Sequence, residues 1–173
     1  MLGFRSLNVF NGCDVIGLEF HYNTTIEGKF QGLNLSYMVF NNSVASMTEE
    51  AYAGITTLKY VIFRGNITVS SNAFNGCSGL EYIVLDGTSH NMSGSGFTNC
   101  SNLSRVYIDS QATLDTITSQ SSCGGFLLNN SVKSVYVARS LTPNENCYLL
   151  DSSFTKSDNY VVFNGVQYSV YTR

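Results

Sequence analysis

Residues able to do acid–base or nucleophilic chemistry are few in this chain. The two histidines are His21 and His90, and His90 lies in one loop with Asp86 and Ser89, the residue types of a hydrolytic triad. A triad also needs a buried carboxylate that orients the histidine and an oxyanion hole beside the nucleophile. The Gly-Thr-Ser-His loop supplies neither, so we interpret it as a solvated turn. Zinc-protease, serine-hydrolase and nucleotide-binding motifs do not occur, so we expect no enzyme, no catalytic residue and no cofactor.

The five cysteines do not form a metal motif, because structural zinc sites use close pairs such as C-x-x-C and none occurs. Cys13, Cys77 and Cys100 each lie three positions after an aromatic residue, which predicts a small thiol in a tight inward site. A disulfide between Cys77 and Cys100 is geometrically feasible in stacked copies but not required. Cys123 and Cys147 fall in two longer linkers, where we expect more reactive thiols.

The aromatic residues next to these thiols belong to an internal repeat. In the clearest copies, apolar residues lie six, nine and eleven positions after the aromatic, as Leu58, Val61 and Phe63 do after Tyr52. A period in the low twenties is typical of solenoid coils that each carry one short strand. One coil cannot bury these groups alone, so the coils must stack and build an interior ladder. The seven aromatics are Phe10, Phe30, Tyr52, Phe74, Phe97, Phe126 and Phe154.

The apolar positions of each copy should point inward from strands of a parallel sheet, with neighbouring strands about 4.8 Å apart. The first two copies, which start at Phe10 and Phe30, are one residue shorter than the others. The expected inward residues are Val15, Leu18, Phe20, Leu35, Met38, Phe40, Leu58, Val61, Phe63, Leu80, Ile83, Leu85, Leu103, Val106, Ile108, Val132, Val135 and Val137.

The two best-matched copies carry a recognisable motif. Phe74-Asn-Gly-Cys77-Ser-Gly-Leu80 and Phe97-Thr-Asn-Cys100-Ser-Asn-Leu103 follow the order aromatic, x, x, Cys, x, x, Leu. With the apolar residues that follow, this pattern resembles the BspA-type leucine-rich repeats, most specifically between about Ala51 and Val137. The resemblance implies a binding protein, mostly of bacterial or protozoan cell surfaces and in several cases an adhesin. It brings no catalytic residues, and the binding surface is implied by analogy.

The expected fold is a mainly β leucine-rich repeat solenoid of about seven coils, with a parallel sheet of short strands and a C-terminal β-hairpin cap. We expect one domain over residues 1–173. Residues 1–50 would form degenerate N-terminal coils, residues 51–158 the clear repeats and residues 159–173 the cap. The hairpin is predicted by two strand-like segments on either side of Asn164-Gly165, since both residues tolerate positive φ.

The outward face of the predicted sheet is rich in tyrosine. Residues eight, ten and twelve positions after the aromatic, or one fewer in the two short copies, alternate with the inward set and should point out of the sheet. Exposed tyrosines on a rigid sheet can anchor a partner, although strand propensity or coverage by another part of the chain would explain the same pattern. The expected partner-binding residues are Tyr37, Tyr60, Arg64, Tyr82, Arg105, Tyr107 and Tyr136.

Composition limits the classes of partner. Only 12% of residues are charged and the net charge is -3, which gives no electrostatic reason to expect nucleic acid. No apolar run approaches the roughly 20 residues that span a bilayer, so no membrane insertion is expected. The expected partner is another protein or a surface glycan, with self-assembly also open.

Two functions of different class follow from these features. The first is a protein-interaction or adhesion module of a microbial cell surface, and the second is a structural protein of a virion or phage appendage. The residues after Met1 are too polar for a signal peptide. We therefore expect an extracellular or cell-surface location if a signal was removed, and otherwise a virion or cytoplasmic location.

Overall fold

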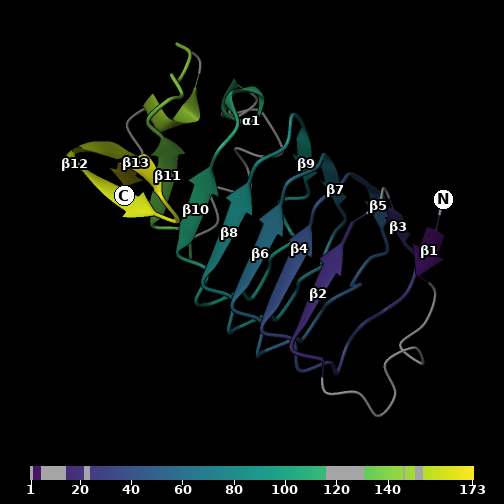
Figure 1. The fold of residues 1–173 in the computed structure, drawn as a ribbon. Coiled ribbons are helices and arrows are strands. Elements are labelled where there is room, and N and C mark those ends of the chain that lie inside the picture. The colour runs from purple at the N-terminus through teal and green to yellow at the C-terminus, as the bar shows by residue number, and fades with distance from the viewer. Residues whose placement is uncertain (1, 5–14, 22–23, 116–130, 146, 151–153) are drawn as a thin grey trace.

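The computed structural model describes residues 2–4, 15–21, 24–115, 131–145, 147–150 and 154–173. Within them the chain is a β-solenoid with very little helix, in which short strands from successive coils stack into two sheets (Figure 1). The repeat period already requires the coils to stack, because each coil completes its core only by packing on its neighbours. The solenoid fold predicted from the sequence is confirmed.

The larger sheet has eight strands and carries the face of interest. Its first six strands, all parallel, are β2 (Gly17–Phe20), β4 (Tyr37–Phe40), β6 (Tyr60–Phe63), β8 (Tyr82–Leu85), β10 (Arg105–Ile108) and β11 (Ser134–Ala138). The register keeps equivalent repeat positions side by side, so that Tyr37, Tyr60 and Tyr82 lie in one row across the strands. The strand positions that the repeat spacing predicts are therefore correct.

The last two strands of this sheet form the C-terminal hairpin, β12 (Thr155–Phe163) and β13 (Val166–Thr172). Asn164 and Gly165 form its turn with φ of 48° and 80°, as expected for a two-residue hairpin loop with positive φ at both positions. Strand β13 pairs antiparallel with β11 and so closes the edge left by the last coil. The predicted hairpin is confirmed, although its first strand starts at Thr155, before the expected boundary.

A second, five-stranded parallel sheet is a feature that the repeat pattern does not reveal. It consists of β1 (Leu2–Phe4), β3 (Thr24–Ile26), β5 (Val44–Met47), β7 (Ile67–Val69) and β9 (His90–Met92). Strand β1 precedes the large sheet, and the other four lie in the segments that connect one strand of that sheet to the next coil. The helix α1 (Gln111–Asp115) follows β10, and a 3-10 turn, η2 (Tyr148–Leu150), precedes the hairpin.

The core lies between the two sheets and contains the predicted aromatic ladder. Phe30, Tyr52, Phe74 and Phe97 are buried and stack in sequence, with ring centroids 5.2, 5.2 and 4.9 Å apart. Phe154 is also buried, whereas Phe10 and Phe126 lie outside the described residues. The ladder is confirmed for the aromatics that the structure describes.

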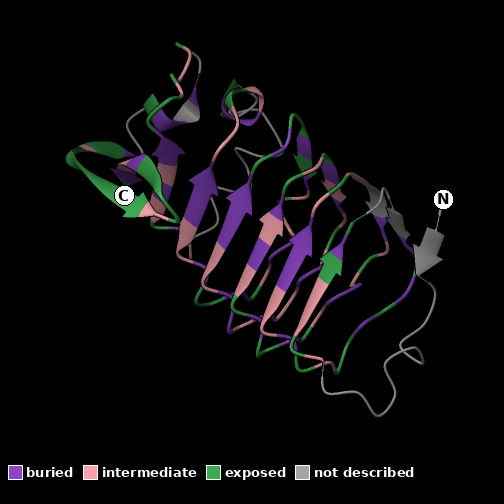
Figure 2. Cartoon of the chain, in the orientation of Figure 1, coloured by how far each residue is buried: buried purple, intermediate pink, exposed green. Residues whose placement is uncertain are grey.

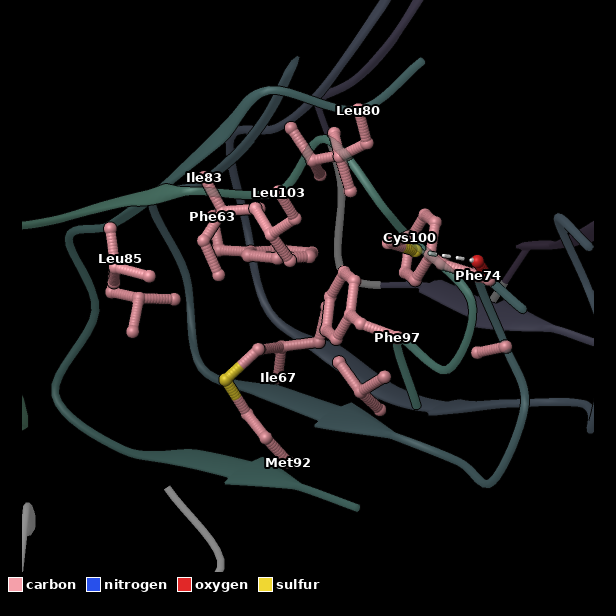
Figure 3. Close-up of a cluster of buried hydrophobic side chains, with 14 of the residues drawn as sticks. Phe63, Ile67, Phe74, Leu80, Ile83, Leu85, Met92, Phe97, Cys100 and Leu103 are labelled. Atoms are coloured by element: carbon pink, nitrogen blue, oxygen red, sulfur yellow. Dashed lines mark hydrogen bonds between the residues drawn. The ribbon is translucent and has the colours of Figure 1, made fainter. Parts of the chain in front are cut away.

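The inward apolar positions behave as predicted (Figures 2 and 3). All of them are buried from Phe20 onward, while Val15 and Leu18 are half-buried at the end of the sheet, where the described chain contributes no further coil. From the second sheet, Ile67 and Met92 pack into the same core (Figure 3). Burial of this continuous apolar interior is the main stabilising contribution.

The chain turns sharply two residues after each ladder aromatic. Gly32, Gly54 and Gly76 have φ between 74° and 86° there, and Asn99 takes the same place with φ of 59°. Glycine and asparagine are the residues that adopt this left-handed conformation most readily. The Asn-Gly-Cys and Thr-Asn-Cys sequences are thus explained by backbone geometry.

The thiols of the repeat are structural. Cys77 and Cys100 are buried and unbonded to each other, and their sulfurs donate to the carbonyl oxygens of Tyr52 and Phe74, each at 3.1 Å. Burial raises the pKa of both thiols to about 12. Cys13 lies outside the described residues. The inward assignment is therefore confirmed for two of the three cysteines.

The prediction of a more accessible linker thiol is wrong for Cys147. Its side chain is only 3% exposed and packs in the main core, and burial raises the pKa of its thiol. The linker folds back into the core at this point instead of extending outward, and Leu149 is buried with it. Cys123 lies outside the described residues.

Candidate interaction face

Asp86, Ser89 and His90, the residue types of a hydrolytic triad, are not arranged as one. His90 lies in β9 with its side chain buried, and its Nε2 atom accepts a hydrogen bond from the backbone N–H of Gly87 at 3.1 Å. Burial lowers the pKa of His90 to about 4, so the ring is neutral near pH 7. The interpretation of this segment as a solvated turn is wrong for His90, because the connecting segment forms a strand of the second sheet. Asp86 and Ser89 are exposed, as expected.

Tyr37, Tyr60 and Tyr82 are the first residues of three neighbouring strands, and their outward side chains form a stack. We call these three residues the tyrosine column. Neighbouring rings are 5.5 and 5.1 Å apart and within 9° of parallel. The strand register creates the stack, since equivalent positions of adjacent parallel strands lie about one strand spacing apart. All three side chains are half-buried, which leaves the ring edges toward solvent.

Both ends of the tyrosine column are defined. At one end the guanidinium of Arg105 lies 5.3 Å from the centre of the Tyr82 ring, and the same group pairs with Glu81 at 3.1 Å. At the other end the Tyr37 ring lies over Gly17, where a Cβ atom would collide with it. Glycine at position 17 therefore gives the Tyr37 ring room to lie flat.

The outward residues two positions further along these strands, such as Tyr107, are covered by the hairpin at its end of the sheet. Tyr107 stacks on Tyr136 and on Phe163, each at 4.5 Å, and meets Tyr168 edge-on at 5.2 Å. Tyr107 is consequently only 3% exposed. The expectation that Tyr107 is exposed is wrong, because β13 pairs with β11 and turns Tyr168 onto the outward face of the sheet.

A small hollow of about 150 Å³ lies between the hairpin tip and the sheet. Its walls include Arg64, Asp86, Asp109 and Tyr168. Burial raises the pKa of Asp109, whose carboxylate accepts a hydrogen bond from the Tyr168 hydroxyl that partly offsets the rise. Burial also raises the pKa of Asp86, and the neighbouring charge of Arg64 acts in the opposite direction. The Asp109–Tyr168 hydrogen bond ties the hairpin to the sheet.

Comparison with known families agrees with this architecture. A sequence model described as BspA type leucine-rich repeat region matches residues 23–153 in six copies. The chain belongs to the BspA-type leucine-rich repeat family. Members of this family generally mediate protein interaction or adhesion, and they are typically surface-associated and non-enzymatic. No curated protein and no solved structure matches the chain significantly.

Two further findings concern bound ions and membranes. Among the residues of this BspA-type protein that the structure describes, no group of three or more His, Cys, Asp or Glu side chains could hold a metal ion. Within the same residues, every helix is too short to cross a bilayer.

The residues predicted to bind a partner divide into two groups in this BspA-type solenoid. Tyr37, Tyr60 and Tyr82 remain partly accessible as the tyrosine column. Arg64 is exposed directly after the other end of β6, where it donates to Asn41 at 2.7 Å. Arg105 caps the column, whereas Tyr107 is covered and Tyr136 is half-buried beside it.

The hairpin residues that shape this face are absent from the sequence prediction. Tyr168 and Phe163 decide which tyrosines stay accessible, and Ile62 and Val84 pack against the same cluster. A signal for them exists: Val166, Tyr168 and Val170 alternate with polar residues along β13. Such alternation indicates a strand with one apolar face that needs a surface to pack on.

Proposed function

We propose that this protein is a non-enzymatic interaction or adhesion module of a microbial cell surface, and that its partner docks on the tyrosine column. The observation that carries the proposal is the column itself: three stacked, half-exposed tyrosines lie on a parallel sheet, with Tyr82 touching the hairpin edge-on at Phe163, 5.5 Å away. Exposed Arg64 directly follows β6, four residues after Tyr60, and would add a charged group at the far side of the same face. Tyr107, which belongs to the hairpin cluster, meets Tyr82 edge-on at 5.7 Å and supports that end of the column.

Stacking prepares these side chains for binding. Each ring is held by its neighbours, so little rotamer freedom remains to be lost when a partner docks. Tyrosine combines a large apolar surface with a hydroxyl that can donate and accept hydrogen bonds, and it is among the residues most enriched at binding hot spots. The column thus presents a row of ring edges and hydroxyl tips with fixed spacing.

The same stacking favours a protein over a glycan as the partner. Sugar rings typically bind aromatic side chains through the ring faces, and here the faces of Tyr60 are occupied by Tyr37 and Tyr82. Ring edges and hydroxyl groups suit the backbone and side-chain hydrogen bonds of a polypeptide. A surface protein of another cell or of a host is therefore the partner that this face fits best.

The test compares a double variant of the column with a control variant elsewhere on the surface. A partner is first isolated from the native surroundings with the wild-type protein, and its affinity is then measured for Tyr37→Ser/Tyr60→Ser. We expect binding to weaken by about 2 kcal/mol or more while the fold persists, because neither ring enters the core. Leu150→Ser, at an exposed side chain outside both the column and β12, is the control and should bind normally. Equal affinity of the double variant and the parent would refute the proposal.

Localisation is tested separately. Antibody labelling of intact cells of the source organism should detect the protein, and protease treatment of those cells should remove the signal. A signal that appears only after the cells are broken would contradict a cell-surface location.

A structural role in a virion or phage appendage is the second candidate. The observation in its favour is the apolar hairpin strand, where Tyr160, Val161 and Val162 are exposed in sequence. Assemblies bury such strands between subunits. Tail or capsid genes beside this gene would support the structural role, and their absence would favour the surface module.

A further inference from the structure

The outer edge of the hairpin is an open sheet edge. Strand β12 is the terminal strand of the eight-stranded sheet and, among the described residues, pairs only with β13 (Figure 1). A strand at this position presents a row of backbone N–H and C=O groups without partners, and natural sheets usually make such strands short, charged or covered. At nine residues, β12 is the longest strand that the structure describes, and its charged residues, Lys156 and Asp158, lie in its first half, so that Tyr160–Phe163 form an uncharged edge.

The side chains of β12 add an apolar surface to this edge. Tyr160, Val161 and Val162 are 52%, 41% and 58% exposed. Figure 2 colours most of the hairpin as exposed. The three residues follow one another, so both faces of the strand are apolar there. On one face, the guanidinium of Arg139 lies 5.0 Å from the centre of the Tyr160 ring. An open edge with apolar side chains on both faces is the kind of surface to which a further strand adds.

We propose that β12 pairs antiparallel with β12 of a second copy of this chain, about a two-fold axis at Val161. In that register Val161 faces Val161 of the second copy, and Tyr160 faces Val162. Such β-branched and aromatic cross-strand pairs are favourable. A shift of the axis to Ser157 would oppose Lys156 and Asp158 but leave the three apolar residues unpaired. It would also run through the irregular pairing between Lys156 and Tyr160.

Self-complementarity is the reason to assign the edge to a second copy. An isologous interface uses the same patch twice, so the patch must not repel itself. The charged side chains of β12 are Lys156 and Asp158, one of each sign, and in the proposed register neither faces a like charge. A dimer of this kind joins the two eight-stranded sheets into one.

The opposite edge of the sheet explains why assembly would stop at a dimer. There, β2 is four residues long and presents the exposed carboxylate of Glu19, two of the features that block strand addition. Pairing through β12 uses up the apolar edge of both copies. The assembly is therefore closed and does not continue as a fibre.

Sedimentation velocity over a range of concentrations tests the pairing. The wild-type chain should form a reversible dimer. Val161→Lys and Val161→Glu, each alone, should weaken association about tenfold or more, because each places like charges at the two-fold axis. An equimolar mixture of the two variants should restore the dimer, since the opposed charges are then complementary. Ile16→Lys is the matched control: that side chain is 68% exposed, next to β2 at the far end of the sheet, and the substitution should leave the dimer unchanged.

Several outcomes would overturn this proposal. They are a wild-type chain that stays monomeric at its highest soluble concentration, a dimer that tolerates both charged variants, and a mixture of the variants that fails to associate. A monomer whose β12 amides gain protection from hydrogen exchange only with another protein would assign the edge to a foreign strand. Thermal unfolding of each variant shows whether it is folded. A dimer in the mixture shows the same independently, because two unfolded chains would not form a native dimer.

Discussion

Removing one ring from the middle of the aromatic ladder should destabilise the entire solenoid. Phe74 is fully buried between Tyr52 at 5.2 Å and Phe97 at 4.9 Å, and Phe63 meets it edge-on at 6.3 Å. Replacing a buried phenylalanine by alanine typically costs about 3–5 kcal/mol. The site should lie near the upper end of that range, because aromatic pairs add about 0.5–1.5 kcal/mol each beyond buried area.

The expected loss is a large share of the total stability. Domains are stable by about 5–15 kcal/mol, so Phe74→Ala should remove a third or more of the free energy of unfolding. Since each coil is stabilised by its two neighbours, the loss should spread along the stack. Urea denaturation followed by circular dichroism measures the change, and the exposed Leu150→Ala should stay within about 0.5 kcal/mol of the wild type.

A double-mutant cycle sharpens the test. Phe74→Ala and Phe97→Ala remove rings that touch, so their effects should not add, and the coupling energy should be about 0.5–1.5 kcal/mol. A loss below about 1 kcal/mol for Phe74→Ala would refute the assignment of this ring to a stabilising ladder. Strict additivity of the two substitutions would show that the rings do not support each other.

Three further predictions follow from the buried groups and the hairpin turn. Cys77, Cys100 and Cys147 should all resist alkylation in the native protein, because burial raises the pKa of each thiol and keeps the reagent out. Mass spectrometry after brief labelling measures the extent of modification. Fast modification of any of the three would contradict its buried position. The pKa of His90 is about 4 in the folded state and 6.5 without burial, so the unfolded chain binds the extra proton between these values. The stability that neutral His90 contributes is complete above pH 6.5 and is lost as the pH falls toward 4. Urea titrations should show that the free energy of unfolding depends less on pH in this window for His90→Phe than for the wild type. The same pH dependence for both proteins would rule the effect out. Gly165 has φ of 80°, so Gly165→Ala should cost the hairpin about 1–2 kcal/mol and speed hydrogen exchange of β13 amides; unchanged exchange would mean that the turn carries no strain.

The repeat architecture could be predicted from the sequence, because its signals are local. The positions of apolar residues after each aromatic depend only on which side chains one coil turns inward. That pattern predicts correctly the strand positions, the parallel register and the burial of residues such as Leu80 and Val106. The Asn164-Gly165 turn is local too, since its backbone conformation restricts the residue types at two adjacent positions.

The second sheet and the burial of His90 could not be predicted in this way. The strand segments at Ile67–Val69 and His90–Met92 are only three residues long and lie in connections that vary in sequence. Such short segments carry no reliable periodicity of their own. They become strands because stacking of the coils brings them side by side, and the N–H of Gly87 then gives the buried imidazole a hydrogen bond.

The accessible part of the candidate face was decided by tertiary structure alone. Alternation along the strands predicts that Tyr60 and Tyr107 both point outward, and both do. Only the antiparallel pairing of β13 with β11 makes them different, because it brings Tyr168 over Tyr107 and leaves Tyr60 uncovered. Strand alternation determines which side of a sheet a residue occupies, whereas exposure depends on which distant segment of the chain packs on that side.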